Sequence, residues 1–338
     1  MAKYITSLDN AKEIIQSGDL IAFPTETVYG LGGNALNQNA VKKIFQSKGR
    51  PANDPLIVHV HSTQNALNLI HLNEKQAEIF RILTSKFWPG PLTIVAPAKD
   101  IIPSQVTSNT GWVGVRIPNH PIAQEFLKRV EVPIAAPSAN RFNHVSPTSP
   151  QHVMDDLGKE PIYILDMGNN ECECGVESSV VKLELDGSAT ILRRGAISDF
   201  DIQNIIAVKI VENQFTKPQT DQMCGPGMTL KHYAPDGVQI YLVDKYIPPQ
   251  FLSKYAIIDF GGFLQRYEDD SEFYFDLSPN KNSFTACRQL FGVLRDVEKK
   301  NADKLFLPGY LLNNLKNIDL ENTLADKFYR AASGNILS

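Results

Sequence analysis

Leu20-Ile21-Ala22-Phe23-Pro24-Thr25-Glu26-Thr27-Val28-Tyr29-Gly30-Leu31 is the stretch of sequence that decides the fold we expect. Its apolar part, residues 20–23, predicts a buried strand. Pro24 ends that strand because it has no N–H to donate and restricts the residue before it. Polar side chains follow at once. A polar stop directly after an apolar strand is typical of an α/β sheet, in which loops at the strand ends share one edge and bind ligands there.

The same arrangement recurs in four further segments, which are Lys48-Gly49-Arg50-Pro51, Gly114-Val115-Arg116-Ile117-Pro118, Ala136-Pro137-Ser138-Ala139-Asn140 and Gly175-Val176-Glu177-Ser178-Ser179. The polar side chains of the five segments include Thr, Lys, Arg, Ser and Asn. Together they predict a site for an anionic, phosphate-rich ligand.

Apolar periodicity predicts two domains, residues 1–211 and 237–338, joined by a polar linker over 212–236. In the first domain, strands alternate with helices, and short strand-to-strand links favour a mixed sheet over a purely parallel one. A helix beginning at Asp199 is expected to close this domain near residue 211. The second domain is expected to be a small, mostly parallel, Rossmann-like βα unit. The fold class is therefore α/β in both parts.

The expected elements follow from these periods. Strands are predicted at 56–60, 92–96, 113–117, 133–136, 162–166, 179–185, 190–193, 238–243, 255–259, 273–275 and 304–307, and helices at 39–47, 74–87 and 282–300.

Composition excludes several classes of protein. The 338 residues carry a net charge of −4, so no overall field favours nucleic acid. Four cysteines do not make a disulfide framework. No apolar run reaches the ~20 residues that a membrane helix needs, and the first residues lack the apolar core of a signal peptide. We therefore expect a cytoplasmic protein with no membrane partner.

Two of the motifs have an alternative interpretation each. Gly30-Leu31-Gly32-Gly33 could present backbone N–H groups to a phosphate, or could form a plain turn from a strand to a helix. Lys48 and Arg50, one residue apart in an expected extended segment, could point together at a polyphosphate or could be two solvated cations. Pro51 and Pro55 make that segment rigid, which favours the phosphate site.

Arg116 lies within an apolar strand and therefore needs an anionic partner. A substrate carboxylate and an internal ion pair with Glu26 both fit. Ser138 and Asn140 are suited to phosphate or ribose oxygens, but Ser and Asn are also ordinary turn residues. Ser146 has the same two interpretations, and could instead cap a helix near residue 150.

The remaining candidates do not predict a metal site or a covalent nucleophile. His59 and His61 are more simply structural histidines of a strand, and Cys172-Glu173-Cys174 is expected to present surface thiols. Gly261-Gly262 only hints at a nucleotide-binding turn, and the chain contains no GxxxxGK[ST] loop. The predicted site is therefore one that orients its reactants.

The set of motifs resembles the YrdC-type L-threonylcarbamoyladenylate (threonylcarbamoyl-AMP) synthases, in their long two-domain form. The resemblance covers about residues 8–210 and is carried by the five segments above together with Asp54-Pro55-Leu56-Ile57-Val58-His59, Trp88-Pro89-Gly90-Pro91-Leu92-Thr93, Arg116-Ile117-Pro118-Asn119-His120-Pro121, Ser146-Pro147-Thr148 and Leu192-Arg193-Arg194-Gly195. Two later segments, Pro226-Gly227-Met228 and Lys231-His232-Tyr233-Ala234-Pro235, resemble the linker of the long form.

The resemblance implies a YrdC-like twisted mixed sheet followed by the smaller domain. It implies synthesis of L-threonylcarbamoyladenylate from L-threonine, bicarbonate and ATP, with release of pyrophosphate and with Mg²⁺ accompanying ATP. The product would pass to a downstream tRNA-modifying threonylcarbamoyl transferase, which acts on the adenosine next to the anticodon. Whether this chain binds tRNA directly is left open.

The resemblance also implies roles for individual residues. Lys48, Arg50, Ser138 and Asn140 would form the catalytic phosphate cradle, and the nucleotide would in addition meet Asp54, Ser146, Arg193 and Tyr233. L-Threonine would be held by Thr27, His59, Arg116, Ala136 and Ser178. Arg194 competes with Arg193 for its role. Separately, the basic and aromatic residues Lys231, His232 and Tyr233 within a polar linker suggest the hypothesis that residues 224–235 fold over the site as a lid, with Tyr233 touching the nucleotide.

Two alternative functions are weaker. A carbamoyl-transfer enzyme of the hydrogenase-maturation type would carry extra zinc-finger and acylphosphatase parts, which this sequence lacks. An RNA-binding module would use Lys48 and Arg50 as a basic patch, but the acidic total and the missing aromatic stacking motif argue against it.

Overall fold

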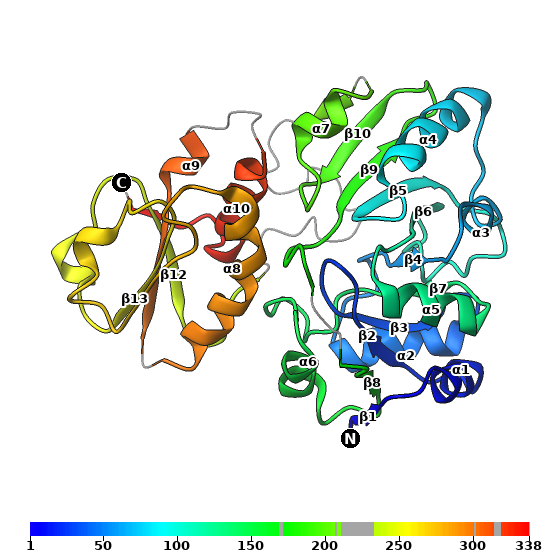
Figure 1. Ribbon diagram of the computed structural model, residues 1–338, viewed down its shortest axis with the longest axis horizontal. Coiled ribbons are helices and arrows are strands. Elements are labelled where there is room, and N and C mark those ends of the chain that lie inside the picture. The colour runs from blue at the N-terminus through cyan, green and yellow to red at the C-terminus, as the bar shows by residue number, and fades with distance from the viewer. Residues whose placement is uncertain (169–171, 207, 211–232, 301, 314–318, 338) are drawn as a thin grey trace.

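The structure is a computed structural model, and it describes residues 1–168, 172–206, 208–210, 233–300, 302–313 and 319–337. Two sheets, each with its own helices, lie side by side (Figure 1). The α/β class expected from the sequence is confirmed. No helix among the described residues is both long enough and apolar enough to cross a bilayer.

The first sheet has eleven strands in the order β1-β8-β2-β3-β7-β4-β6-β5-β9-β10-β11. The sheet contains both parallel pairs, such as β4 with β6, and antiparallel pairs, such as β2 with β3, so the expected mixed sheet is confirmed. The strands are β1 (Lys3–Ile5), β2 (Ile21–Phe23), β3 (Gly30–Asn34), β4 (Ile57–His59), β5 (Leu92–Pro97), β6 (Trp112–Arg116), β7 (Ile134–Ala135), β8 (Tyr163–Leu165), β9 (Ser179–Leu183), β10 (Ala189–Arg193) and β11 (Val208–Ile210).

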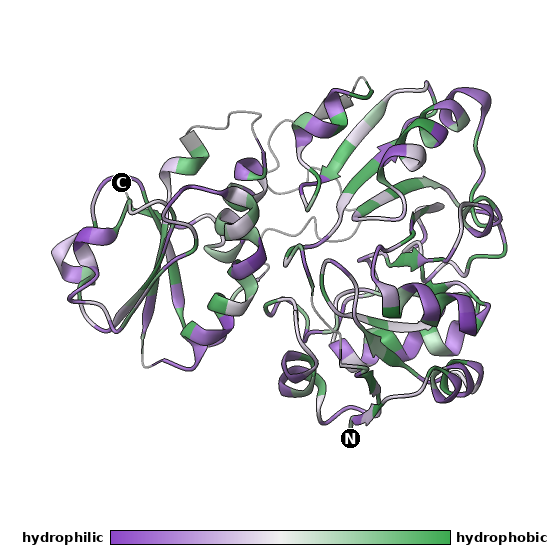
Figure 2. Cartoon of the chain, in the orientation of Figure 1, coloured by the Kyte–Doolittle hydropathy of each residue, from purple (hydrophilic) through white to green (hydrophobic). Residues whose placement is uncertain are grey.

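Alternation along the strands separates two apolar layers. Ile21 and Phe23 of β2 pack with α1 and α5, whereas Ala22 faces the opposite layer with the other helices of this domain. Figure 2 shows this pattern as apolar strands and helices with hydrophilic outer faces. The helices are α1 (Leu8–Gln16), α2 (Gln38–Lys48), α3 (Thr63–Leu67), α4 (Glu74–Phe87), α5 (Pro121–Val130), α6 (Pro150–Leu157) and α7 (Asp199–Gln203).

The glycine-rich segment after Tyr29 is the strand β3, so the expected turn was wrong, while a backbone contact between Gly30, which lines the cavity described below, and a phosphate stays a prediction. Its glycines leave room for neighbouring side chains. A Cβ at Gly32 would lie 2.7 Å from Ile134 Cγ2 and 2.9 Å from Phe23 Cε1. The segment therefore serves close packing within the sheet and offers no phosphate-binding turn.

Two other local predictions were wrong. Lys48 is the last residue of α2, and Gly49 follows as its C-cap with φ of 62°, so Lys48 and Arg50 do not share an extended segment. The helix that begins at Asp199 ends at Gln203, and the strand β11 follows it.

The second sheet has five parallel strands in the order β14-β13-β15-β12-β16, which confirms the expected parallel βα domain. Its strands are β12 (Gln239–Val243), β13 (Tyr255–Asp259), β14 (Phe273–Asp276), β15 (Lys304–Pro308) and β16 (Ile336–Leu337), and its helices are α8 (Ser283–Glu298), α9 (Tyr310–Asn313) and α10 (Glu321–Ala331), with 3₁₀ turns at Pro249–Phe251 and Gln265–Tyr267.

Helices α8 and α10 lie on the side of the second sheet that faces the first domain (Figure 1). Their apolar side chains form one cluster with Val28, Val145 and Val176 of the first domain. The two domains therefore share a continuous hydrophobic core at their contact.

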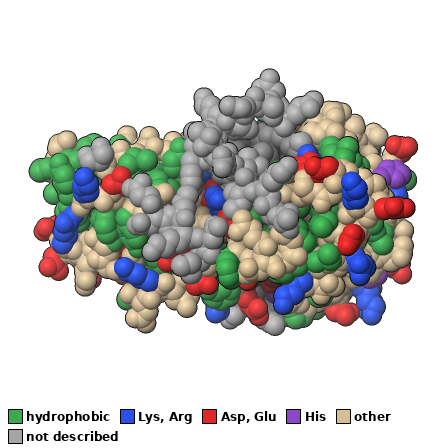
Figure 3. Space-filling model, turned by 90° about the horizontal axis from the view of Figure 1, so that it is seen from above, with side chains coloured by type: hydrophobic (Ala, Val, Ile, Leu, Met, Phe, Trp, Pro, Cys, Tyr) green, Lys and Arg blue, Asp and Glu red, His purple; other side chains and the backbone are tan. Residues whose placement is uncertain are grey.

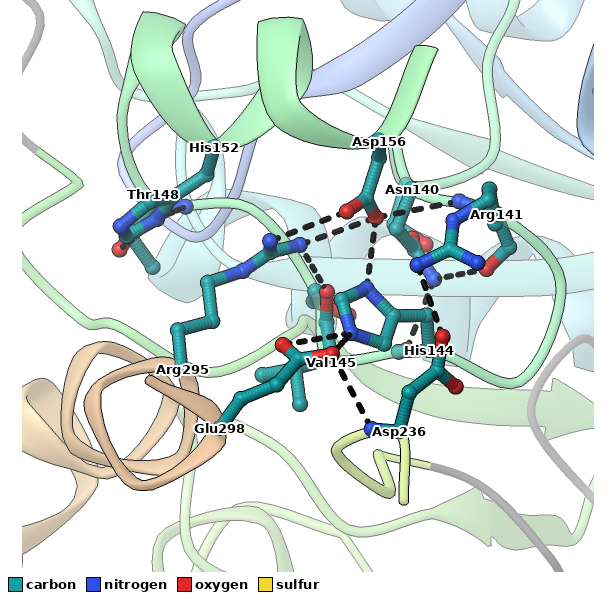
Figure 4. Close-up of polar contacts among 12 residues, drawn as sticks. Asn140, Arg141, His144, Val145, Thr148, His152, Asp156, Asp236, Arg295 and Glu298 are labelled. Atoms are coloured by element: carbon teal, nitrogen blue, oxygen red, sulfur yellow. Dashed lines mark hydrogen bonds and ion pairs between the residues drawn. The ribbon is translucent and has the colours of Figure 1, made fainter. Parts of the chain in front are cut away.

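A polar network bridges the same contact (Figure 4). Nδ1 of His144 lies 2.9 Å from Asp156 on α6, and Nε2 lies 3.1 Å from Glu298 on α8. Arg295, also on α8, donates to both oxygens of Asp156 at 3.1 Å. We call these four side chains the bridging network.

Candidate active site

A cavity opens at one edge of the first sheet. It is lined by Thr25, Thr27, Val28, Gly30, Arg50, Ile57, His59, Arg116, Ala136, Pro137, Ser138, Glu177, Ser178 and Arg193. Every one of the five segments identified in the sequence contributes to this wall, so the fold gathers them as expected at one edge of the sheet.

Hydroxyl groups fix the loop that follows β2. Thr25 Oγ1 lies 2.8 Å from Thr27 Oγ1 and donates to the carbonyl of Val28 at 2.6 Å. It also accepts from the backbone N–H groups of Thr27 and Val28, each at 3.2 Å. The buried Thr25 side chain therefore holds Thr27 in place at the cavity wall.

Arg116, at the end of β6, has one of the two partners foreseen for it. Its Nη2 lies 2.8 Å from Glu26 Oε1, and both side chains are only 4% exposed. Its Nε donates to the carbonyl of Gly90 at 3.3 Å. The internal ion pair is thus present, and because Arg116 also lines the cavity, its predicted role toward a substrate carboxylate stays a prediction.

His59, at the end of β4, is a neutral group of the wall. Burial, together with the nearby charge of Arg116, lowers the pKa of its imidazole to about 3. It can therefore exchange hydrogen bonds at neutral pH without adding charge. His61 is exposed and lies on a different cavity, so the two histidines do not act together.

Arg50 and Lys48 are held by different groups. Arg50 pairs with Asp54 at 2.8 Å and donates to the carbonyl of Pro55 at 3.0 Å, which places its buried guanidinium at the wall. Lys48 donates to the carbonyl of Ser138 at 2.6 Å and to that of Asn140. Lys48 therefore fastens the Ser138–Asn140 loop from behind the wall.

The two arginines in Leu192-Arg193-Arg194-Gly195 separate clearly. Arg193 lines the cavity and donates to Ser178, from Nε to the carbonyl at 3.1 Å and from Nη2 to Oγ at 3.0 Å. Arg194 Nε pairs with Asp199 at 2.7 Å. The placement favours Arg193 for the predicted nucleotide contact.

Five of the predicted site residues do not line the cavity, namely Lys48, Asp54, Asn140, Ser146 and Tyr233. The first four contact residues of the wall or its loops. Ser146 Oγ donates to Glu177 at 2.6 Å, and the helix near residue 150 is capped by Ser149 instead. Asn140 donates to the carbonyls of Arg141 and His144 at 2.7 and 2.8 Å.

Tyr233 is fully buried at the domain contact. Its ring stacks on Phe291 of α8 with centroids 5.1 Å apart, and its hydroxyl accepts from Lys327 of α10 at 3.2 Å. Lys231 and His232 of the predicted lid lie outside the described residues. A nucleotide contact by Tyr233 stays a prediction.

Sequence reasoning missed several wall residues, above all Thr25 and Glu177. Both belong to motifs that had been singled out. An acidic side chain in Gly-Val-Glu-Ser-Ser was the available signal for Glu177, but a carboxylate did not fit the expectation of an anion site.

Among the described residues, Cys172, Cys174, Cys287 and one acidic cluster do not line the cavity. Cys172 is buried in the core, contrary to the expected surface thiol, and burial raises its pKa. Among the described residues, His144, Asp236 and Glu298 offer ligand atoms within 4.8 Å of one another. They belong to the domain contact drawn in Figure 4, where Arg141 also pairs with Asp236 at 3.0 Å, and none of them lines the cavity.

Comparison with known proteins agrees with this geometry. A family model described as "Telomere recombination", which groups Sua5, YciO and YrdC proteins, matches residues 13–195. A second, described as "Threonylcarbamoyl-AMP synthase, C-terminal domain", matches residues 197–333. The chain belongs to the two-domain Sua5 family.

Two relatives of this Sua5-family chain match most of its length. It is similar to threonylcarbamoyl-AMP synthase of Pyrococcus abyssi, with 36% identity over 88% of this chain and 87% of the relative. It is also similar to that of Schizosaccharomyces pombe, with 34% identity over 90% of this chain and 84% of the relative.

A solved structure has the same fold. The crystal structure of P. abyssi Sua5 complexed with L-threonine has a TM-score of 0.86 and 32% sequence identity, and it matches 100% of this chain and 99% of that one. The two-domain architecture is therefore the one that this family uses.

Proposed function

We propose that this protein synthesises L-threonylcarbamoyladenylate from L-threonine, bicarbonate and ATP, releasing pyrophosphate. The observation that carries the proposal is the convergence of three guanidinium groups, those of Arg50, Arg116 and Arg193, on one cavity. Similarity to the P. abyssi enzyme and to Sua5 with bound L-threonine supports the same substrates.

The reaction places two anions next to each other. The amine of threonine combines with bicarbonate to give a carbamate, and water leaves. A carbamate oxygen then attacks the α-phosphorus of ATP, the bond to the β-phosphate breaks, and pyrophosphate departs. This makes the protein a nucleotidyltransferase whose work is to align the reactants and to neutralise their charge.

The charges around the cavity suit that task. Three buried arginines, Arg50, Arg116 and Arg193, and the buried Lys48 side chain lie near three buried carboxylates, those of Glu26, Asp54 and Glu177. The carboxylates already contact Arg116, Arg50 and Ser146, respectively. Mg²⁺, which neutralises phosphate charge, would therefore be coordinated by the phosphates of ATP, because each of these carboxylates already contacts a side chain of the protein.

Threonine fits the side of the cavity around β4 and β6. Arg116 would bind its carboxylate while still contacting Glu26. Thr27, neutral His59, the Ala136 backbone and Ser178 would surround the rest of the molecule.

ATP fits the side around α2, the Ser138–Asn140 loop and β10. Arg50 and Ser138 would meet the phosphates directly, and Lys48 would hold the Ser138 and Asn140 backbone that receives them. Arg193 would contact the nucleotide from β10. Ser146, Asp54 and Tyr233, which do not line the cavity, stay predicted nucleotide contacts.

The product is a mixed anhydride that loses its acyl group readily, so an acyl-accepting enzyme must follow. We propose that this is a threonylcarbamoyl transferase acting on the tRNA adenosine beside the anticodon, and that both act in the cytoplasm. On the face seen in Figure 3, basic and acidic side chains are interspersed over the residues not drawn in grey, which does not favour a large RNA surface there.

Pyrophosphate release by the purified protein with ATP and Mg²⁺ tests the proposal, with threonine and bicarbonate each present or omitted. Release that requires both co-substrates is the expected result. Release that does not depend on threonine would point to hydrolysis or another acceptor, and would contradict the proposal.

A further inference from the structure

Helix α10 of the second domain reaches the first domain directly behind the cavity wall. Thr323 Oγ1 donates to the carbonyl of Gly195 at 2.9 Å, and Lys327 Nζ donates to the carbonyl of Arg194 at 3.1 Å. Both acceptors follow Arg193, which lines the cavity. One turn of α10 therefore holds the backbone that carries Arg193.

The Lys327 ammonium also meets a carboxylate of the wall itself. Its Nζ lies 3.4 Å from Glu177 Oε2, and the Lys327 side chain is 0% exposed. The other Glu177 oxygen accepts from Ser146 Oγ at 2.6 Å. Glu177 is thus held from one side by its own domain and from the other side by the second domain.

An acidic group on the wall of an anion site is unfavourable unless its charge is compensated. Glu177 lines the same cavity as Arg50 and Arg193, which are expected to bind phosphates. Because Glu177 is only 5% exposed, water screens its charge poorly. Lys327 is the buried cation that offsets this charge from behind the wall.

The surroundings of Lys327 fix its position. Asp326 lies 3.7 Å away, Tyr233 accepts a hydrogen bond at 3.2 Å, and the ammonium also lies 4.8 Å from the centroid of the Tyr233 ring. Burial alone would lower the pKa of Lys327, but Tyr233, Glu177 and Asp326 together raise it. The lysine is therefore charged in the folded protein.

We propose that Lys327 is a positioning residue for the reaction, through which the second domain completes the substrate cavity. It holds Glu177 and the Arg193–Gly195 backbone in place and cancels the Glu177 charge, so that a polyphosphate can bind beside it. This inference rests on the proposed function, and it gives the second domain a role in substrate binding.

The test compares ATP affinity by calorimetry in four folded proteins: wild type, Lys327→Met, Glu177→Gln and the double variant. We expect Lys327→Met to weaken ATP binding about tenfold, because it leaves a buried anion uncompensated next to the phosphates. The double variant should bind ATP within about threefold of Glu177→Gln alone, since the uncompensated charge is gone. A structural role alone would leave the double variant as impaired as Lys327→Met.

Controls separate folding from positioning. Lys327→Arg, which keeps the charge, should retain ATP affinity. Lys299→Met, at an exposed lysine that follows α8, should behave as wild type. Unchanged ATP affinity in folded Lys327→Met, or a loss that Glu177→Gln does not relieve, would overturn the inference. If Lys327→Met does not fold, a tenfold loss of ATP affinity in Lys327→Arg relative to wild type would overturn the inference. A tenfold loss of ATP affinity in the double variant relative to Glu177→Gln would also overturn it.

The pyrophosphate assay on the wild type keeps the two proposals apart. Threonine-independent release by the wild type would overturn the proposed function. A wild type that makes product, combined with unchanged ATP binding in Lys327→Met, would overturn only the role of Lys327.

Discussion

In the proposed reaction, Arg116 would contact two carboxylates, that of Glu26 and that of threonine. Its guanidinium already contacts Glu26 at 2.8 Å, and the cavity that it lines is where the carboxylate of threonine would lie. A guanidinium group has five N–H donors in one plane. One edge of the Arg116 group can therefore keep the ion pair with Glu26 while another edge binds the substrate carboxylate. The two interpretations that the sequence left open are therefore compatible.

Arg116→Ala should weaken threonine binding much more than ATP binding. Loss of a charge-assisted contact predicts a rise in the threonine Kd of about ten- to a hundredfold, and an uncompensated Glu26 should lower the free energy of unfolding by about 3–5 kcal/mol. Calorimetry with each substrate checks the first effect. Arg116→Ala/Glu26→Gln should regain stability without regaining threonine affinity. Equal loss of affinity for both substrates would remove Arg116 from the carboxylate role.

Lys48→Ala should mainly lower turnover. Burial and the neighbouring Arg50 lower the pKa of the Lys48 ammonium well below its ordinary value, and a bound polyphosphate would favour its charged form again. Losing this donor to the Ser138 and Asn140 carbonyls should cost about 10²-fold in kcat, comparable with the loss of one preorganised donor. Lys42→Ala, at an exposed position on the same helix, is the matched control. A kcat equal to wild type in Lys48→Ala would place Lys48 outside the machinery.

At the residue scale the sequence predicted which segments form the site better than it predicted how each side chain acts. Three of the five motifs follow the strands β2, β6 and β7, whose ends the topology brings together. The other two differ from the expectation, because Lys48–Pro51 follows the helix α2 and Gly175–Ser179 leads into β9. Lys48 shows what the sequence could not predict. Its contact with the Ser138 and Asn140 carbonyls, about ninety positions along the chain, depends on how α2 packs against the loop that carries them. Glu177 was missed because its compensating cation, Lys327, lies in the other domain.

At the element scale, apolar periodicity predicted several long elements closely, although the helices α5 and α10 were not among the predictions. The helix expected at 74–87 is α4, and the strand expected at 255–259 is β13. The spacing of apolar residues along the sequence is what made both elements predictable. It failed at β3, where glycines provide no side-chain pattern, and at β11, a three-residue strand that pairs with β10. Such strands are fixed by their neighbours in the sheet.

Gly32→Ala tests whether close packing decides the identity of the β3 residues. The new Cβ would meet Ile134 at 2.7 Å and Phe23 at 2.9 Å, so overpacking should lower the free energy of unfolding by about 1–3 kcal/mol. Gly292→Ala is the opposite case, because the added Cβ within α8 meets no atom within 4 Å among those described. It should stabilise the protein by about 0.5–1 kcal/mol. Chemical denaturation of both variants checks the pair, and a neutral Gly32→Ala would show that β3 tolerates a side chain.

At the scale of the whole molecule, the second domain is bound to the first by apolar contacts and by charge. Val28, Val145 and Val176 complete the core of the second domain, and Val28 also lines the cavity. The sequence predicted the two domains but not this contact, because none of the three valines differs in pattern from any other core residue. The stability of the site and the docking of the second domain are therefore coupled.

The bridging network gives this coupling a pH dependence. Burial alone would raise the pKa of Asp156, but hydrogen bonds from His144 and Arg295 lower it to about 2. A carboxyl whose pKa is lowered by folding stabilises the protein above its ordinary pKa, and this stabilisation is lost as the pH falls from about 4 to about 2.

Asp156→Asn should therefore lower the free energy of unfolding at neutral pH by about 2 kcal/mol or more, and the difference from wild type should narrow between about pH 4 and pH 2. Denaturation of both proteins across that pH range measures the difference in their free energies of unfolding. Asp155→Asn, at an exposed position on the same helix, should stay within about 0.5 kcal/mol of wild type throughout. A gap that is independent of pH would mean that Asp156 acts through packing, and that the charge on α8 contributes nothing to holding the domains together.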